Sequence, residues 1–241
     1  MSDSWSLTVG EVQCWTLNLA LDEPPADAQR LLSADEQARA ARYKFDSDRN
    51  RFLHVRTTLR SLLGRYTGQA PEQLQFEFNE HKKPCLPKSD SAVDVRFNVS
   101  HSGSTALLAF AAGVDLGVDV EFHRELSDML SVANWCLSEE QFADFESITP
   151  LAEQRQAFFR FWTRKEALIK AIGKGLAQPL KEFDVTFRSD QPPGLLRAGQ
   201  SFGEIANWQL CDITVAGPYH ACLAMPTRTI RLVTRQFDIH D

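Results

Sequence analysis

The chain has 241 residues, of which 43% are hydrophobic and 24% are charged, and its formal net charge is -6 at pH 7. These values are typical of a soluble globular protein with one large or two smaller domains, and they exclude a disordered chain or a fibre. The acidic balance argues against a nucleic-acid partner, and no stretch approaches the roughly 20 apolar residues of a membrane span.

The cysteines indicate a reducing compartment. None of the five forms a CxxC pair or has a histidine at a zinc-site interval: Cys14, Cys85, Cys136, Cys211 and Cys222. The first residues also lack a basic segment followed by an apolar run, which an export signal would need. We therefore expect a cytoplasmic protein with free thiols.

The first half of the chain predicts a mixture of helices and strands. A strand is expected near 12–19, followed by a helix over 33–43 with Ser33 as its N-cap, and a longer helix over 48–65. A strand over 74–78 and a loop over 81–90 come next. The half ends in a hairpin of 95–100 and 106–112, with the HSGS turn between them.

The second half predicts a similar series of elements. It begins with a strand over 116–122 and helices near 126–135 and 138–145. A long helix over 151–172 follows, and strands over 183–187, 208–215 and 219–225 close the half. The expected fold class is therefore α+β.

Two helical segments resemble each other across the halves. RFLHVRTTLRSLLGRY begins at Arg51 and RFWTRKEALIKAIGKG at Arg160, an offset of 109 that aligns Gly64 with Gly173. ALLAF at 106–110 recurs as ACLAM at 221–225, an offset of 115. Amphipathic helices can share such residues by chance. A duplication would instead give two similar α+β halves, 1–113 and 114–241, related by a pseudo-twofold axis with a ligand cleft between them.

Basic residues gather on the two helical segments. Nine basic and four acidic residues lie within 30–65, and seven basic residues and one acid lie within 155–181. Clustered cations in an acidic chain favour one anionic ligand held at a defined place. Two solvated helix faces would give the same count, so both interpretations stay open at this point.

The segment GVDVE, 117–121, places two carboxylates on one side of a strand. Side chains alternate along a strand, so Asp119 and Glu121 point one way and Val118 and Val120 the other. Two such oxygen ligands suit Mg²⁺. The same alternation also describes any half-exposed strand.

The long second-half helix places an acid among apolar groups. At 100° per residue, one stripe holds Trp162, Glu166, Ile169, Lys170 and Gly173. A carboxylate on such a face needs a partner. The alternative is an exposed helix whose lysines complement the helix dipole. In the aligned first-half helix, Thr57 stands at the position of Glu166.

The segment FNVSHS, 97–102, ends a strand in small hydroxyls and a histidine. The Ser100 hydroxyl, the His101 ring and nearby backbone N–H groups form a donor set that suits phosphate oxygens. By itself the segment could equally be an ordinary hairpin turn.

Together, FNVSHS, GVDVE and FWTRKEALIKAIGKGL resemble the signature of the 4'-phosphopantetheinyl transferases. HKKPCLP, which begins at His81, resembles the Gly-Lys-Pro segment of that family, with Lys82 in place of the glycine. The length resembles the monomeric, two-fold-symmetric group that activates peptide and polyketide synthases. The resemblance implies transfer of the phosphopantetheine arm of coenzyme A to a serine of an apo acyl or peptidyl carrier protein, with release of 3',5'-ADP.

The resemblance also implies roles for individual residues. It makes Asp119, Glu121 and Glu166 the ligands of Mg²⁺, for which Mn²⁺ could substitute. Glu166 would be the base, directly or through a metal-bound water, with Lys165 and Lys170 stabilising phosphate charge. The residues implied in coenzyme A binding are Arg51, Lys83, Ser100, His101, Lys165 and Lys170.

The resemblance implies a different binding role for each half. Half 1–113 would contact the adenosine-phosphate end of coenzyme A. Half 114–241 would hold the metal and would dock the acidic carrier protein on the basic helix within 155–181.

Two other functions stay open from the sequence alone. One is a non-catalytic module that binds coenzyme A or a carrier protein on the same scaffold. The other is an unrelated metal-dependent phosphohydrolase, which would need no carrier protein.

Overall fold

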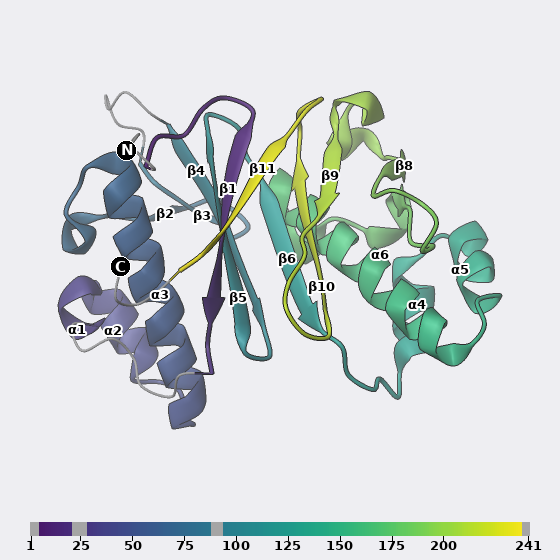
Figure 1. Cartoon of the computed structure of the whole chain (residues 1–241), viewed down its shortest axis with the longest axis horizontal. Coiled ribbons are helices and arrows are strands. Elements are labelled where there is room, and N and C mark those ends of the chain that lie inside the picture. The colour runs from purple at the N-terminus through teal and green to yellow at the C-terminus, as the bar shows by residue number, and fades with distance from the viewer. Residues whose placement is uncertain (1–4, 21–27, 88–93, 238–241) are drawn as a thin grey trace.

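The computed structural model of the chain describes residues 5–20, 28–87 and 94–237. It has four layers, with helices outside and two sheets inside (Figure 1). The first helical layer is α1 (Ala28–Leu31), α2 (Ala34–Ala40) and α3 (Asp46–Thr67); the second is α4 (Met129–Cys136), α5 (Glu139–Glu146) and α6 (Leu151–Ile172). The fold is therefore α+β, as the sequence predicts.

Each half forms its own sheet with the same strand order. The first half contributes β1 (Glu11–Asn18), β4 (Val95–Ser102) and β5 (Thr105–Ala112) in the order β1-β5-β4. The second contributes β6 (Gly117–Phe122), β9 (Gln209–Asp212) and β10 (Tyr219–Met225) in the order β6-β10-β9. All four of these pairings are antiparallel. The halves thus share one topology, in which the first strand pairs with the last.

Three apolar clusters hold the layers together. One lies between α3 and the first sheet and includes Leu59, Leu62 and Phe110. Another lies between α6 and the second sheet. The third joins the two sheets face to face through residues such as Leu107 and Val118. Burial of apolar surface on both faces of each sheet therefore fixes the two halves against each other.

The helix boundaries follow from their capping residues. The predicted N-cap of α2, Ser33, is confirmed. The Ser33 hydroxyl accepts the Glu36 N–H and the Glu36 carboxylate accepts the Ser33 N–H, which together form a capping box. The predicted bounds of α6 are confirmed, and Gly173 ends the helix at φ +72°. The helix α3 continues to Thr67 and ends at Gly68, also at φ +72°.

The structure corrects the alignment of the repeat. Because Gly68, not Gly64, ends α3, the two helix ends match at an offset of 105 and not 109. The strand alignment also shifts. Leu108 and Phe110 face α3, and Cys222 and Ala224 face α6. The offset of 115 would place these residues on opposite faces, since a slip of one residue reverses a strand.

Several strands differ from the prediction. The segments 74–78 and 183–187 form only β2 (Glu77–Phe78) and β7 (Asp184–Val185), which pair with β3 (Pro84–Cys85) and β8 (Leu195–Arg197). The strand β9 covers only part of 208–215. The predicted loop 81–90 contains β3, and its last residues lie outside the described part of the chain.

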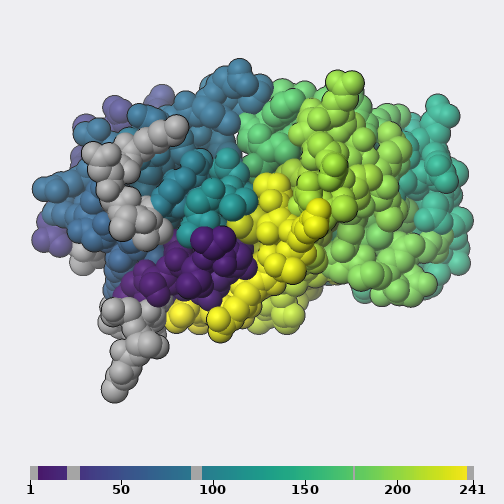
Figure 2. Space-filling model, turned by 90° about the horizontal axis from the view of Figure 1, so that it is seen from above, coloured from purple at the N-terminus to yellow at the C-terminus, as the bar shows by residue number. Residues whose placement is uncertain are grey.

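The last strand was not predicted. β11 (Arg231–Gln236) pairs in parallel with β1 and becomes the edge of the first sheet. Figure 2 shows this C-terminal segment lying between the N-terminal strand and the second half. The end of the chain therefore returns to the sheet of the first half.

Within the described residues, no helix combines the length and apolar character required to cross a membrane.

Candidate active site

The three acids of the sequence motifs meet in one pocket between the halves. This acidic pocket has a volume of about 420 Å³ and is lined by Val99, Ser100, His101, Asp119, Glu121, Trp162, Glu166 and Lys170. β4 supplies the first three residues, β6 the next two and α6 the last three. The alternation of β6 behaves as predicted, because Val118 and Val120 point into the cluster between the sheets.

A glycine allows α6 to approach β6 closely. A Cβ atom added to Gly117 would lie 2.0 Å from the carbonyl oxygen of Ala167 and 2.5 Å from the backbone nitrogen of Ala171. No larger residue fits without moving the helix backbone. Gly117 therefore sets the spacing that brings Glu166 to Asp119 and Glu121.

The acidic pocket is electrostatically strained. Burial, with repulsion from Asp119 and Glu121, raises the pKa of Glu166 to about 7, against the attraction of Lys170. Burial and the Asp119 charge raise the pKa of Glu121 as well. Carboxylates that repel one another in a partly buried site are stabilised by a nearby positive charge. Lys170 supplies part of it, because its Nζ atom donates to Asp119 Oδ1 at 2.6 Å.

The donor chemistry of the pocket fits a hard divalent cation. Among the described residues, no group of three His, Cys, Asp or Glu side chains is placed so that it could hold a metal ion, and Lys170 lies against Asp119. However, Asp119 Oδ2 is buried without a hydrogen-bond partner, and such an oxygen is costly unless it gains one. Three carboxylates with a free buried oxygen provide the ligands that Mg²⁺ prefers.

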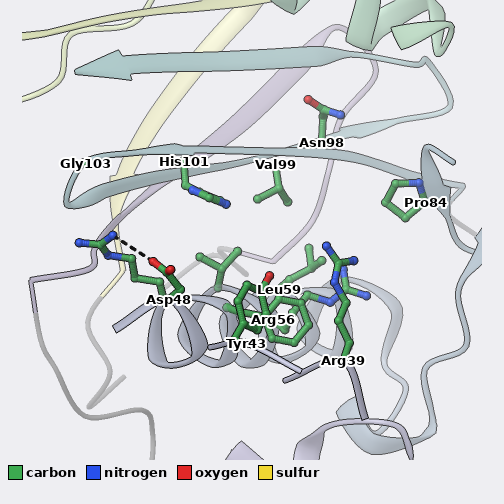
Figure 3. A pocket seen from close by; sticks show the side chains of 13 residues that line it. Arg39, Tyr43, Asp48, Arg56, Leu59, Pro84, Asn98, Val99, His101 and Gly103 are labelled. Carbon is green, nitrogen blue, oxygen red and sulfur yellow. Dashed lines mark ion pairs between the residues drawn. The ribbon is translucent and has the colours of Figure 1, made fainter. Parts of the chain in front are cut away.

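A second, cationic pocket lies between α3 and β4 (Figure 3). It has a volume of about 390 Å³. Its charged and aromatic lining comprises Arg39, Tyr43, Asp48, Arg51, Phe52, Arg56 and His101. In Figure 3, His101 and Val99 point from β4 toward the helices that carry the arginines. The pocket can therefore hold an anionic ligand with a flat ring system.

The two pockets are neighbours that share a wall. Val99 and His101 line both of them. Burial, together with the positive charges of Lys170 and Arg51, lowers the pKa of His101, so its ring is neutral at pH 7. A ligand that spans both pockets would pass His101, with its anionic groups between the arginines and Lys170.

Two predicted site lysines lie elsewhere. Lys165 is 1% exposed and donates to the carbonyl groups of Leu180 and Phe183 on the core side of α6. Lys83 donates to the carbonyls of Leu116 (3.1 Å) and Ala171 (3.3 Å). Neither lysine lines either pocket. The structure thus joins Ser100, His101 and Lys170 to the acids and places Arg51 in the cationic pocket.

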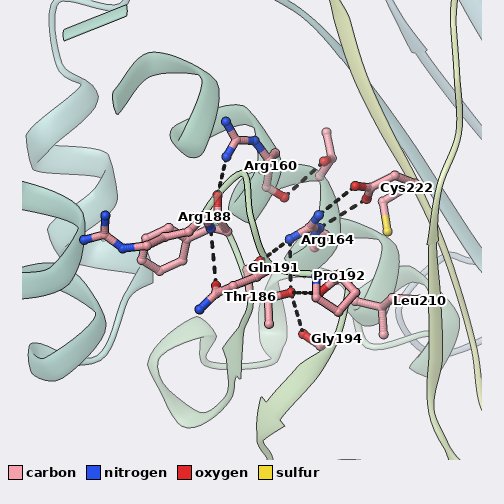
Figure 4. A network of polar contacts seen from close by, with 12 residues as sticks. Arg160, Arg164, Thr186, Arg188, Gln191, Pro192, Gly194, Leu210 and Cys222 are labelled. Atoms are coloured by element: carbon pink, nitrogen blue, oxygen red, sulfur yellow. Dashed lines mark hydrogen bonds and ion pairs between the residues drawn. The ribbon is translucent and has the colours of Figure 1, made fainter. Parts of the chain in front are cut away.

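The basic helix is not the exposed surface that its charge count suggests. Arg160, Arg164 and Lys165 are buried. Arg164 donates to the carbonyl of Thr186 at 2.5 Å and to Asp212 at 2.6 Å, and Arg160 donates to the carbonyl of Phe187 at 2.6 Å (Figure 4). These side chains donate hydrogen bonds to segments that follow α6 in the sequence. Of the seven basic residues within 155–181, these three are therefore not available to dock a carrier protein, whereas Lys174 and Lys181 are exposed.

Other residues of the pockets were missed. Arg39, Tyr43 and Phe52 line the cationic pocket, and Trp162 lines the acidic one. The excess of basic residues within 30–65 included Arg39, but no motif distinguished it from its neighbours. Trp162 did fall on the predicted stripe with Glu166 and Lys170.

Comparisons with known proteins identify the family of the chain. The model of the 4'-phosphopantetheinyl transferase superfamily matches residues 115–224, and the model of a 4'-phosphopantetheinyl transferase N-terminal domain matches 23–112. The fold and the site thus define a phosphopantetheinyl transferase type of protein.

Individual relatives match similar shares of the chain. The 4'-phosphopantetheinyl transferase HetI of a Nostoc species is 36% identical over 80% of this chain and 81% of its own. The transferase Sfp of Bacillus subtilis is 30% identical over 66% of this chain and 68% of its own. A solved holo-[acyl-carrier-protein] synthase of Thermotoga maritima is more distant, with a TM-score of 0.39, 19% identity and coverage of 48% and 64% of the two chains. The chain belongs to the 4'-phosphopantetheinyl transferase superfamily.

Proposed function

We propose that this chain transfers the 4'-phosphopantetheine arm of coenzyme A to a serine of an apo acyl or peptidyl carrier protein and releases 3',5'-ADP. The observation that carries the proposal is the pair of adjoining pockets, one cationic and aromatic, the other acidic. Coenzyme A matches both, because a phosphorylated adenosine is joined through a diphosphate to the group that is transferred. Membership of the superfamily gives this geometry its reaction.

Coenzyme A would lie across the shared wall of the two pockets. The adenosine and its phosphate would occupy the cationic pocket beside Arg51 and Arg39, with the base against Tyr43 or Phe52. The diphosphate would pass His101 and reach Lys170. Ser100 would bind less directly, because its hydroxyl already donates to Asp119 at 2.8 Å. Lys83 and Lys165 would support this arrangement from the carbonyl groups that they bind.

Asp119, Glu121 and Glu166 would hold Mg²⁺, or Mn²⁺ in its place. The ion would neutralise charge on the diphosphate as the leaving group departs. The oxygen atom of the carrier serine forms a bond to the phosphorus on the pantetheine side, and the bond from that phosphorus to the oxygen of 3',5'-ADP breaks. The serine proton would pass to Glu166, directly or through a bound water, because this carboxylate lines the same pocket as Lys170 and the other two acids. Lys170 stabilises the phosphate charge.

The carrier protein would approach the open side of the acidic pocket along the second half, 114–241. The exposed cations left on this half near α6 include Lys174 and Lys181, which would attract an acidic carrier. A KM for the carrier that rises steeply with salt, while the KM for coenzyme A changes little, would support this surface. We further propose that the enzyme is a cytoplasmic monomer with the halves 1–113 and 114–241. Light scattering measures whether it is a monomer.

The transfer assay decides between the functions that the sequence left open. The protein is incubated with Mg²⁺, coenzyme A and a panel of apo carrier proteins, and the mass of each carrier is measured. Addition of one phosphopantetheine to the carrier serine is the expected result. Binding without a mass change would indicate a non-catalytic module, and release of free phosphopantetheine without any carrier would indicate a phosphohydrolase.

A further inference from the structure

The strands β4 and β6 belong to different sheets, yet side chains join them along their length. From Asn98 to the end of β4, every second side chain accepts a hydrogen bond from a backbone N–H group of β6. The pairs are Asn98 with Val118 (2.9 Å), Ser100 with Val120 (3.4 Å) and Ser102 with Phe122 (3.1 Å). Side chains of one strand face thus replace the backbone ladder that would otherwise pair the two strands. We call these three contacts the β4–β6 ladder.

The two serines of the ladder each make a second hydrogen bond. Ser100 Oγ donates to Asp119 Oδ1 at 2.8 Å, and Ser102 Oγ donates to Glu121 Oε2 at 2.9 Å. A hydroxyl group can do this because it accepts and donates at once. An alanine would lose both bonds. The ladder therefore has a hydroxyl beside each of the two acids of β6.

Loss of the hydroxyl should affect the neighbouring acid more at Ser102 than at Ser100. Asp119 is also held by Lys170 Nζ at 2.6 Å, and Lys170 donates to Ser100 at 3.0 Å. Asp119 would therefore keep a donor if Ser100 lost its hydroxyl. Glu121 also receives a hydrogen bond from the Trp162 side chain. However, the Glu121 side chain is longer and has more rotamers to lose, so a donor fixed to the backbone of the neighbouring strand restricts it more.

We propose that Ser102 is a positioning residue, which orients the Glu121 carboxylate in the acidic pocket and ties that orientation to the junction between the halves. This inference rests on the proposed role of Glu121 as a cation ligand. Partners that orient ligating carboxylates in this way are worth about 10–100-fold in metal affinity in other proteins. The Ser102 side chain therefore contributes to cation binding without touching the cation.

The test measures binding of Mn²⁺ alone to the full chain, from the loss of the free-ion EPR signal. S102A is expected to bind Mn²⁺ about 10-fold more weakly than the unchanged protein, and S102T, which keeps the hydroxyl, is expected to restore the affinity. Ser104 provides a matched control, because its hydroxyl contacts Tyr219 at 3.2 Å and no acid. S104A should leave Mn²⁺ affinity unchanged.

A variant at Asn98 distinguishes the orientation of Glu121 from the general stability of the junction between the halves. N98A removes a contact of the same ladder that involves no carboxylate, so it should lower the free energy of unfolding in urea but keep Mn²⁺ affinity. The inference is overturned if S102A binds Mn²⁺ as tightly as the unchanged protein. It is also overturned if N98A weakens Mn²⁺ binding as much as S102A does.

E121Q distinguishes this inference from the proposed function. If the unchanged protein binds no Mn²⁺, or E121Q does not weaken binding, then Glu121 is no cation ligand, and both proposals fall at that step. If E121Q weakens binding but S102A does not, the cation site stands and only the positioning role of Ser102 is wrong.

Discussion

The first strand of each half lies beneath the long helix of that half, but the two strands carry opposite kinds of side chain. When Leu108 and Phe110 of β5 are aligned with Cys222 and Ala224 of β10, the residues paired with these strands also align. Gln13, Trp15 and Leu17 of β1 then correspond to Gly117, Asp119 and Glu121 of β6. Trp15 and Leu17 belong to the apolar cluster beneath α3. The same scaffold position is therefore a core in the first half and an acid site in the second. A shared topology fixes where side chains meet and leaves their chemistry free.

The two helices agree in another position. At the offset of 105, Arg60 matches Lys165, and both are 1% exposed. Arg60 donates to the carbonyls of Pro71 and Leu74, as Lys165 does to those of Leu180 and Phe183. Each cation thus binds the backbone of the segment that follows its helix. This similarity explains why Lys165 points away from the site: it belongs to the scaffold that the halves share.

The largest expected effect comes from removing the acid that only the second half carries. Glu166→Ala should lower transfer by about 10²–10⁴-fold, the usual contribution of a general base, and by more if the cation is lost too. Because burial and neighbouring acids raise the pKa of Glu166 from 4.5 to about 7 in the folded protein, its charge opposes folding as the pH rises through that range. The variant should therefore be at least as stable as the unchanged protein at pH 8.

Two first-half positions serve as controls for Glu166. Thr57 is its counterpart in the sequence alignment, and Ser61 is its counterpart when the helix ends are matched. Thr57→Ala and Ser61→Ala should change turnover little. Unchanged turnover in Glu166→Ala, or an equal loss in the controls, would contradict a single site in the second half.

The next largest effect concerns the spacing of α6 above β6. In the first half, the matched position holds Gln13, whose side chain fits beneath α3 and accepts the Tyr66 hydroxyl at 2.6 Å. In the second half, even a methyl group on Gly117 would meet the helix backbone at 2.0 Å. Gly117→Ala should lower the free energy of unfolding by about 1–3 kcal/mol and should sharply reduce turnover, because the helix must move away from the strand.

Gly194 is the matched control for Gly117. A Cβ atom there would meet its nearest neighbour at 3.8 Å, so Gly194→Ala should leave turnover and urea unfolding nearly unchanged. If Gly117→Ala behaves like Gly194→Ala, close approach of the helix does not govern the acid site.

The acid site was predictable because its signals are local. Asp119 and Glu121 share a face by alternation, and Trp162, Glu166 and Lys170 share a helical stripe, so each set needs only one element. The directions of Lys83 and Lys165 depend on carbonyl groups of other segments, which periodicity does not reveal. The strand β11 escaped prediction for a similar reason. It is a half-exposed edge strand whose pairing with β1, over 200 residues away in the sequence, leaves little trace in its own residues.

A smaller effect is expected from histidines whose buried ring nitrogens lack a hydrogen-bond partner, which among the described residues are His54 in the first half and His123 and His220 in the second. Burial lowers the pKa of His54 below 6.5, and burial with the nearby His123 and Arg160 lowers that of His220 to about 4. The unfolded chain then binds protons that the folded chain does not. The free energy of unfolding should therefore decrease as the pH falls below 6.5 toward 4.

Urea unfolding at several pH values measures this dependence. His54→Leu and His220→Leu should each flatten it, and the double variant should flatten it by the sum, because the sites lie in different halves. A slope that neither variant changes would assign the pH dependence to other groups.

The smallest expected effect is at the turn between β2 and β3, which links the first half to the end of α6. Lys82 has φ +65°, a left-handed conformation that costs a residue with a side chain about 1–2 kcal/mol. Asn79 holds the turn, since its Oδ1 accepts the Lys83 N–H at 2.8 Å and its Nδ2 donates to the Gly173 carbonyl at 2.8 Å.

Lys82→Gly should relieve this strain and raise the free energy of unfolding by up to about 1 kcal/mol, after the greater entropy of glycine in the unfolded chain is counted. Lys82→Ala retains a Cβ atom and should give no such gain. Equal free energies of unfolding for the two variants would show that backbone strain at Lys82 does not destabilise the protein. A gain in both would point instead to the positive charge, which lies in a segment that already carries Lys83.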